Sequence, residues 1–83
     1  MQVADKVVVV TGGANGIGKA LCEAFHQAGA AKVVVADMEA AGARAVAATV
    51  NGAAFKCDVA QEKDIAHVIE ETERQFGPIE LFS

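Results

Sequence analysis

Three glycines at a fixed spacing stand where a strand pattern gives way to a helical pattern. Gly12, Gly16 and Gly18 follow a run of four valines, and the helical pattern opens at Gly16. Gly12 permits a tight turn, Gly16 lets a ligand approach the backbone, and Gly18 lets the helix pack close to the sheet. Backbone N–H groups near Ile17, at the helix start, would then face the ligand. This arrangement is typical of a site for a nucleotide pyrophosphate.

A carboxylate ends the second apolar run, Lys32 to Asp37. Asp37 follows Gly18 by about 20 residues, the separation that a dinucleotide-binding fold places between its glycine turn and its ribose-binding acid. A carboxylate there accepts hydrogen bonds from the ribose hydroxyls and repels a 2′-phosphate, so it predicts NAD rather than NADP as the cofactor. No arginine lies beside Asp37. Its alternative role, compatible with the first, is to cap the following helix.

A second acid follows the third apolar run. Asp58 and Val59 come directly after Cys57 and would lie at the carboxyl edge of the sheet. There Asp58 could accept a hydrogen bond from an adenine amino group, and Val59 could cover the ring. The alternative for Asp58 is a cap of the third helix.

Other motifs in the chain favour less specific interpretations. Gly13 to Lys19 matches the pattern of a phosphate-binding P-loop, but Ala20 stands where that motif needs a hydroxyl for Mg²⁺. His26 and His67 have polar neighbours and no partners at metal-ligand spacing, so we predict no metal site. The acidic residues Glu70, Glu71 and Glu73 are expected to form a solvated helix face.

The elements that must position these residues alternate along the chain. We expect strands at 6–11, 32–37, 53–57 and 79–82, and helices at 16–28, 39–50 and 61–76. The expected apolar faces are Ile17, Leu21, Ala24, Phe25 and Ala28 in the first helix, Ala43, Val46, Ala47 and Val50 in the second, and Ile65, Val68, Ile69 and Phe76 in the third.

This alternation predicts an α/β fold, a Rossmann-type doubly wound parallel sheet with strand order 3-2-1-4 and three helices. The first two helices would cover one face and the third helix the other. A parallel sheet normally has both faces covered, so we expect residues 1–83 to be a partial dinucleotide-binding domain that stops at the start of its fourth strand.

Composition narrows the function further. The chain has 83 residues, 53% of them hydrophobic, and a formal net charge of −4. An acidic balance argues against nucleic acid as a partner. No stretch approaches the ~20 apolar residues of a membrane span, so no membrane partner is expected. Cys22 and Cys57 are interpreted as buried, reduced thiols, which favours a cytoplasmic location.

Taken together, these residues resemble the N-terminal half of the short-chain dehydrogenase/reductase family. The resemblance covers nearly the whole chain: Thr11-Gly12-Gly13-Ala14-Asn15-Gly16-Ile17-Gly18, then Asp37, then Cys57-Asp58-Val59, then Phe76-Gly77-Pro78-Ile79-Glu80. It implies NAD as cofactor and hydride exchange between an alcohol and a ketone. It also assigns Gly12, Asn15, Ile17 and Gly18 to the pyrophosphate, Asp37 to the ribose, and Asp58 and Val59 to the adenine.

The family's catalytic segment has no counterpart in this sequence. Its general acid is a tyrosine in a Tyr-x-x-x-Lys pair, and this sequence contains no tyrosine. We therefore name no catalytic residue and expect these 83 residues alone to show no turnover. The complete protein would act on an alcohol or ketone and form a homo-oligomer. The alternatives are a truncated nucleotide-binding module that associates with a longer partner, and a truncated product without a ligand.

Overall fold

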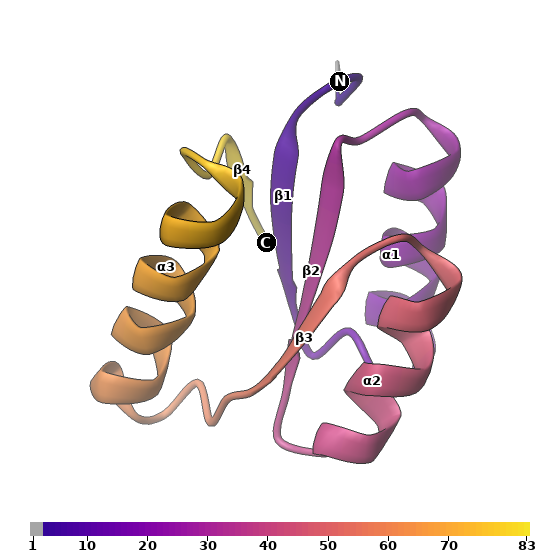
Figure 1. Cartoon of the computed structure of the whole chain (residues 1–83). Helices are drawn as coiled ribbons and strands as arrows, with labels where there is room; N and C mark the ends of the chain where they lie inside the picture. Colours follow the sequence, from indigo (N-terminus) through magenta and orange to yellow (C-terminus); the bar gives the residue numbers. More distant parts are fainter. Residues whose placement is uncertain (1–2) are drawn as a thin grey trace.

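The computed structural model describes residues 3–83, which form four strands and three helices (Figure 1). The order along the chain is β1 (Val7–Thr11), α1 (Gly16–Gln27), β2 (Lys32–Asp37), α2 (Ala40–Thr49), β3 (Ala53–Lys56), α3 (Glu62–Phe76) and β4 (Leu81–Phe82). Each predicted element is present, and its ends differ from the prediction by at most two residues. The predicted domain began at Met1, and positions 1 and 2 lie outside the described residues.

The strands form one parallel sheet in the order β3-β2-β1-β4, which confirms the predicted 3-2-1-4 arrangement. The central pair, β1 and β2, runs in register from Val7 opposite Lys32 to Thr11 opposite Ala36. Parallel strands need crossover connections, and each helix supplies one of them. All four carboxyl ends therefore point to the same edge of the sheet, where the predicted site residues lie.

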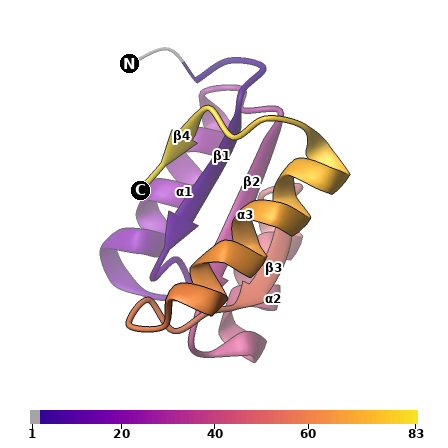
Figure 2. The ribbon, with the colours of Figure 1, turned by 90° about the vertical axis from the view of Figure 1, so that its left-hand side faces the viewer.

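The helices cover the two faces of the sheet unequally, as expected from the sequence. α1 and α2 pack side by side on one face, and α3 lies alone on the other (Figures 1 and 2). Because side chains alternate across a strand, neighbouring residues of β1 and β2 enter different layers. The layer beneath α1 and α2 contains Val8, Val10, Val33 and Val35, together with Cys22, Phe25, Ala43, Val46, Ala47 and Val50.

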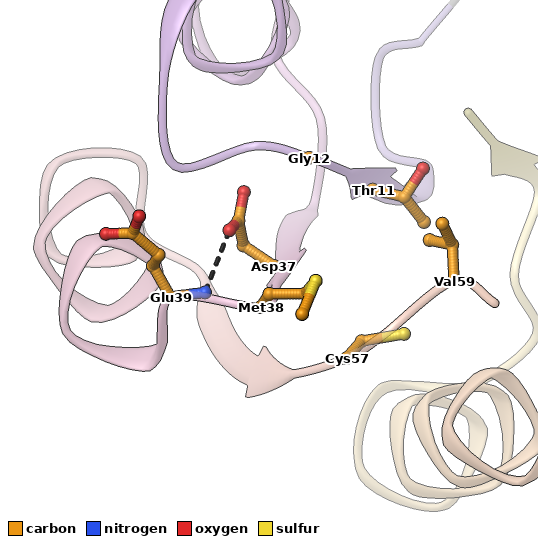
Figure 3. A pocket seen from close by; sticks show the side chains of 7 residues that line it. All are labelled: Thr11, Gly12, Asp37, Met38, Glu39, Cys57 and Val59. Carbon is orange, nitrogen blue, oxygen red and sulfur yellow. Dashed lines mark hydrogen bonds between the residues drawn. The ribbon is translucent and has the colours of Figure 1, made fainter. Parts of the chain in front are cut away.

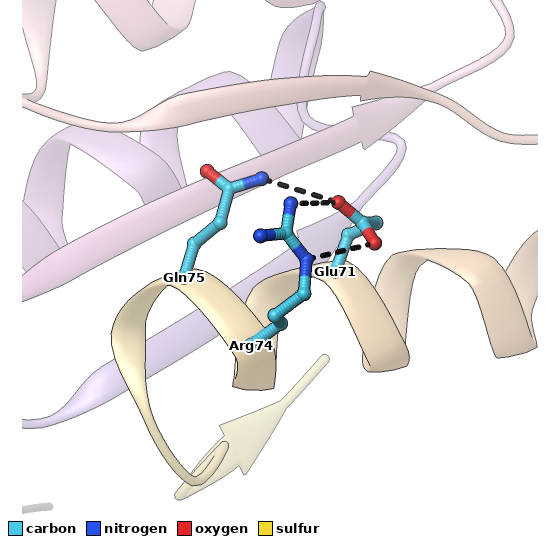
Figure 4. Close-up of polar contacts among 3 residues, drawn as sticks. All are labelled: Glu71, Arg74 and Gln75. Carbon is cyan, nitrogen blue, oxygen red and sulfur yellow. Dashed lines mark hydrogen bonds and ion pairs between the residues drawn. The ribbon is translucent and has the colours of Figure 1, made fainter.

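The layer beneath α3 is smaller. Val9, Val34, Ala36, Cys57 and Val68 are buried there, while Phe55, Ile65, Phe76 and Ile79 are only half-buried. The exposed side of α3 carries an ion pair, Glu71–Arg74, with Gln75 donating to the same carboxylate (Figure 4). At the amino edge of the sheet, the Lys32 ammonium lies 5.3 Å from the centroid of the Phe76 ring and so links β2 to α3.

The predicted apolar face of α1 is wrong in part. Ile17 is 83% exposed, and Ala24 and Ala28 are also exposed, whereas Cys22 and Phe25 are buried. The helix is rotated so that the side of Cys22 and Phe25, rather than that of Ile17 and Ala24, meets β1 and β2. The predicted faces of α2 and α3 are correct: all four residues of the α2 stripe are buried, and the four of the α3 stripe are buried or half-buried.

Candidate dinucleotide-binding site

The loop between β1 and α1 is shaped by the left-handed backbone of two of its glycines. Gly12 has φ = 68° and Gly16 has φ = 55°, values that a residue with a side chain rarely adopts. A Cβ on Gly16 would meet nothing within 4 Å, so the space beside this glycine is open. The predicted tight turn at Gly12 and the free approach to the backbone at Gly16 are therefore both present in the structure.

Gly18 and Gly13 are needed for close packing. A Cβ on Gly18 would lie 2.7 Å from the carbonyl carbon of Gly12 and 3.0 Å from the Cα of Gly13. The close approach that Gly18 permits is thus to the glycine loop itself, not to the sheet as the sequence suggested. Gly13, to which the sequence assigned no role, has no space for a side chain because Val35 Cγ1 lies 2.8 Å from its ideal Cβ position.

The first turn of α1 offers donors without a competing acceptor. Its N-cap residue is Asn15, whose side chain makes no capping hydrogen bond to the described residues, and the turn contains no acidic residue. The N–H groups of Gly16, Ile17 and Gly18 precede the first intrahelical bond, which Lys19 donates to the Asn15 carbonyl. An anion would find here the positive end of the helix dipole and three N–H groups that have no acceptor among residues 3–83.

Asp37 lies at the end of β2 and is held by two backbone N–H groups. Its Oδ2 accepts from the Ala14 N–H at 3.1 Å. Its Oδ1 accepts from the Glu39 N–H at 2.9 Å (Figure 3). The alternative that Asp37 caps α2 is wrong in detail, because the N-cap residue of that helix is Glu39. The carboxylate instead closes a turn just before the helix.

Asp58 makes a similar turn after β3. Its Oδ1 accepts from the Ala60 N–H at 2.9 Å, and its own N–H donates to Asp64 Oδ2 at 3.0 Å. The N-cap residue of α3 is Gln61, so Asp58 is not that cap. Val59 follows and is 59% exposed, so this aliphatic side chain is not part of the hydrophobic core.

These residues surround a pocket of about 390 Å³ at the carboxyl edge of the sheet (Figure 3). Asp37 and Val59 belong to its wall, as does Gly12, and the walls come from the ends of β1, β2 and β3. The full lining consists of Thr11, Gly12, Asp37, Met38, Glu39, Cys57 and Val59. Asn15, Gly16, Ile17 and Gly18 lie outside this pocket, at the start of α1, and Asp58 lies between two lining residues.

Four lining residues were not predicted from the sequence: Thr11, Met38, Glu39 and Cys57. Each of them ends a strand or follows one within two residues, and this position at the carboxyl edge is the signal that could have identified them. Met38 is 61% exposed and forms an apolar side of the pocket. Burial, with the nearby carboxylates of Asp64 and Asp58, raises the pKa of the Cys57 thiol above its ordinary value of 9.0, so this thiol is uncharged at neutral pH.

Among residues 3–83, no cluster of three or more His, Cys, Asp or Glu side chains could hold a metal ion. In the same part of the chain, every helix is too short or too polar to cross a membrane.

The architecture and the glycine loop define a class of protein, the Rossmann-type α/β domains with a dinucleotide-type turn after the first strand. Residues 6–83 match the family described as short chain dehydrogenase, so this chain belongs to that family.

Comparisons with individual proteins agree with this assignment. The chain is 44% identical over 80 residues to an L-fucose dehydrogenase of Bos taurus, with 95% of this chain and 29% of the relative covered. It is 42% identical over 81 residues to the sorbose reductase SOU1 of Candida albicans, with 93% and 29% covered. The chain thus spans less than a third of the length of these curated relatives.

A solved structure shows the same fold. The 3-ketoacyl-(acyl-carrier-protein) reductase of Brucella melitensis, crystallised in complex with NADH, superimposes with a TM-score of 0.91 at 30% sequence identity. The superposition covers 96% of this chain and 34% of the reductase. The sheet and helices described above therefore occur almost unchanged in a protein that binds NADH.

Proposed function

We propose that this chain is the NAD-binding part of a short-chain dehydrogenase/reductase that exchanges a hydride between the cofactor and an alcohol or ketone. One observation carries the proposal: the α1 N-terminus has no side-chain cap, and the Asp37 carboxylate lies beside the same glycine loop, where it accepts the Ala14 N–H. These are the groups that a pyrophosphate and a ribose need at one edge of a sheet. The family membership and the NADH complex of the related reductase support the same function.

The residues present fit the cofactor. The N–H groups of Gly16, Ile17 and Gly18 would hold the pyrophosphate, with Gly12 and Asn15 shaping the loop before them. Asp37 would bind the ribose, while Asp58 and Val59 would contact the adenine at the β3 end of the pocket. When bound, the nicotinamide supplies or accepts the hydride. The residues of this chain bind and orient the adenosine half of the cofactor.

The charge of the pocket supports NAD rather than NADP. Its wall contains two carboxylates, Asp37 and Glu39, and neither arginine nor lysine. A 2′-phosphate placed near Asp37 would be repelled by that carboxylate and would find no cation in compensation. We therefore propose NAD as the physiological cofactor.

Substrate, assembly and location are proposed for the whole protein. The sequence has no tyrosine to act as the family's general acid, so we place no catalytic step on these 83 residues. The partner is an alcohol or ketone of small size, and the assembly is a homo-oligomer. The free thiols of Cys22 and Cys57 favour the reducing cytoplasm.

The test is a titration of the protein with NADH and NADPH, followed by the change in nicotinamide fluorescence. We expect NADH to bind at least tenfold more tightly, a difference of about 1.4 kcal/mol. Equal affinities would contradict the choice of NAD, and failure of both cofactors to bind would contradict the function itself. The intact mass of the native protein, compared with the 8.5 kDa of this chain, would show whether a catalytic segment accompanies it.

A further inference from the structure

The glycine loop is attached to the rest of the domain through Ala14, which is not one of its glycines. Ala14 lies between Gly12 and Gly16, yet its side chain is buried, with only 6% of the residue exposed. Its N–H donates to Asp37 Oδ2 at 3.1 Å. A loop residue with both its side chain and its N–H engaged is fixed in place, so the loop is held at its middle.

Two neighbouring contacts show what the loop is fixed to. The Gly12 N–H donates to the Ala36 carbonyl of β2 at 2.8 Å. On the other side, an ideal Cβ at Gly42 in α2 would lie only 3.1 Å from the Ala14 Cβ, so the loop rests directly on the first turn of that helix. The carboxylate of Asp37 joins both parts, because its second oxygen accepts the Glu39 N–H at 2.9 Å, just before α2 begins.

We infer that Asp37 is a positioning residue for the pyrophosphate-binding loop, in addition to the ribose contact proposed for it. It would act through Ala14, whose N–H it fixes, and so keep the start of α1 aimed at the phosphates. The ligand in this inference comes from the proposed function, whereas the contact is the hydrogen bond from the Ala14 N–H to Asp37 Oδ2. The Asp37 side chain thus contributes to binding even when a ligand offers it no hydroxyl.

A ligand without ribose hydroxyls separates the two roles. The probe is 2′,3′-dideoxyadenosine 5′-diphosphate, which keeps the adenine and the pyrophosphate but offers nothing for a ribose-binding acid to accept. If Asp37 only binds ribose, the Asp37→Ala variant should bind this probe as tightly as the wild type, or more tightly because a negative charge near the phosphates is gone. If Asp37 positions the loop, we expect about fivefold weaker binding, the net value of one hydrogen bond.

A second variant assigns the effect to the correct hydrogen bond. Asp37→Ser keeps a hydroxyl that can close the short turn to the Glu39 N–H, but its side chain is one bond too short for Ala14. We expect Asp37→Ser to bind the probe as weakly as Asp37→Ala. Recovery of wild-type affinity would overturn the inference, because the turn before α2 would then be the important contact. Glu23→Gln, which removes one exposed charge from α1, serves as the control and should bind the probe as the wild type does.

Amide hydrogen exchange tests the contact without any ligand. In the unliganded wild type, the Ala14 N–H should exchange at least about tenfold more slowly than in an unstructured peptide, and the protection should be lost in Asp37→Ser. Unprotected Ala14 in the wild type would overturn the inference even if a variant failed to fold. A wild type that binds neither ADP nor the dideoxy probe, yet shows a protected Ala14, would instead contradict only the proposed function.

Discussion

The ideal Cβ position of Gly18 lies 2.7 Å from the carbonyl carbon of Gly12. The two residues are six positions apart in the sequence. The loop between them folds back, so that the first turn of α1 contacts the backbone at the start of the loop. No side chain can be inserted at this point without moving backbone. This contact, more than any distance to the sheet, explains why position 18 is glycine.

The first prediction is that Gly18→Ala destabilises the protein although it improves helix propensity. In an exposed helix interior the change from glycine to alanine stabilises by about 1 kcal/mol. Here the overlap with the Gly12 backbone should cost more than that, about 1–3 kcal/mol as for other overpacked sites. Thermal unfolding measures the sign directly. A higher Tm than that of the wild type would contradict the packing argument, and Lys19→Ala is the neighbouring control.

The second prediction concerns Lys32, which lies over the Phe76 ring and is 3.5 Å from Asn51 Oδ1. Lys32→Ala removes the only cation at this ring among the described residues and should lower the free energy of unfolding by about 0.5–1 kcal/mol, as for other exposed cation–π pairs. Denaturant unfolding is the measurement. Lys63→Ala, on the exposed face of α3, should have a smaller effect, and equal losses for both variants would count against the cation–π contact.

The third prediction is a loss of stability at alkaline pH. Burial, with a smaller contribution from Glu23, raises the pKa of the Cys22 thiol from 9.0 to about 11. The folded state therefore holds this proton more firmly than the unfolded state. The stabilisation of the folded state by the protonated thiol is complete below pH 9.0 and is lost as the pH rises through about 11.

The Cys22→Ala variant is the comparison for that pH profile. Its stability should fall less steeply than that of the wild type between pH 9.0 and about 11. Parallel profiles for the two proteins would show that the thiol has no part in the alkaline loss. Alkylation adds an independent measurement: both buried cysteines should react with iodoacetamide only after the protein is unfolded.

The fourth prediction concerns the ion pair on α3. The Arg74 guanidinium, 2.6 Å from Glu71 Oε1, lowers the pKa of the Glu71 carboxyl (Figure 4). A depressed pKa stabilises the folded state above the ordinary pKa of the acid, and this contribution disappears as the pH falls through the lowered value. The Tm difference between wild type and Arg74→Met should be small at pH 7 and should vanish in acid. A difference that persists there would show that packing, not charge, is lost.

The sequence was most informative where residue type and position point to the same structure. Continuous valines in β1 and β2 predicted strands buried on both faces, and the alternation of strands and helices predicted the order of the sheet. Asp37 was found because it ends the second apolar run about 20 residues after Gly18, the spacing of a dinucleotide-binding fold. The rotation of α1 was not predicted, because its apolar residues lie on more than one side and alanine buries too little area to decide between them.

The contact between Asp37 and Ala14 could not be predicted from spacing. The chain turns at Gly12, which has a left-handed backbone, and the Ala14 N–H then donates to the carboxylate that ends β2. A glycine pattern shows that such conformations are available but not which direction the intervening amides take. Met38 and Glu39 were missed for a related reason, since both follow a strand and their place in the pocket is set by the turn that Asp37 closes.

The pairing of β4 with β1 brings together the first and last strands of the described residues. Thr11 donates both its N–H and its hydroxyl to the Ser83 carbonyl, across a separation of 72 residues. Every other strand pairing joins segments linked by one helix, so this pairing closes by far the longest loop and loses the most chain entropy. During folding it should therefore form last, after β1, β2 and β3 are assembled. Pulse-labelled exchange that protected the Ser83 amide before those of β2 would contradict this order. On a ribosome, β1 would lack its β4 neighbour until the residues up to Ser83 had emerged.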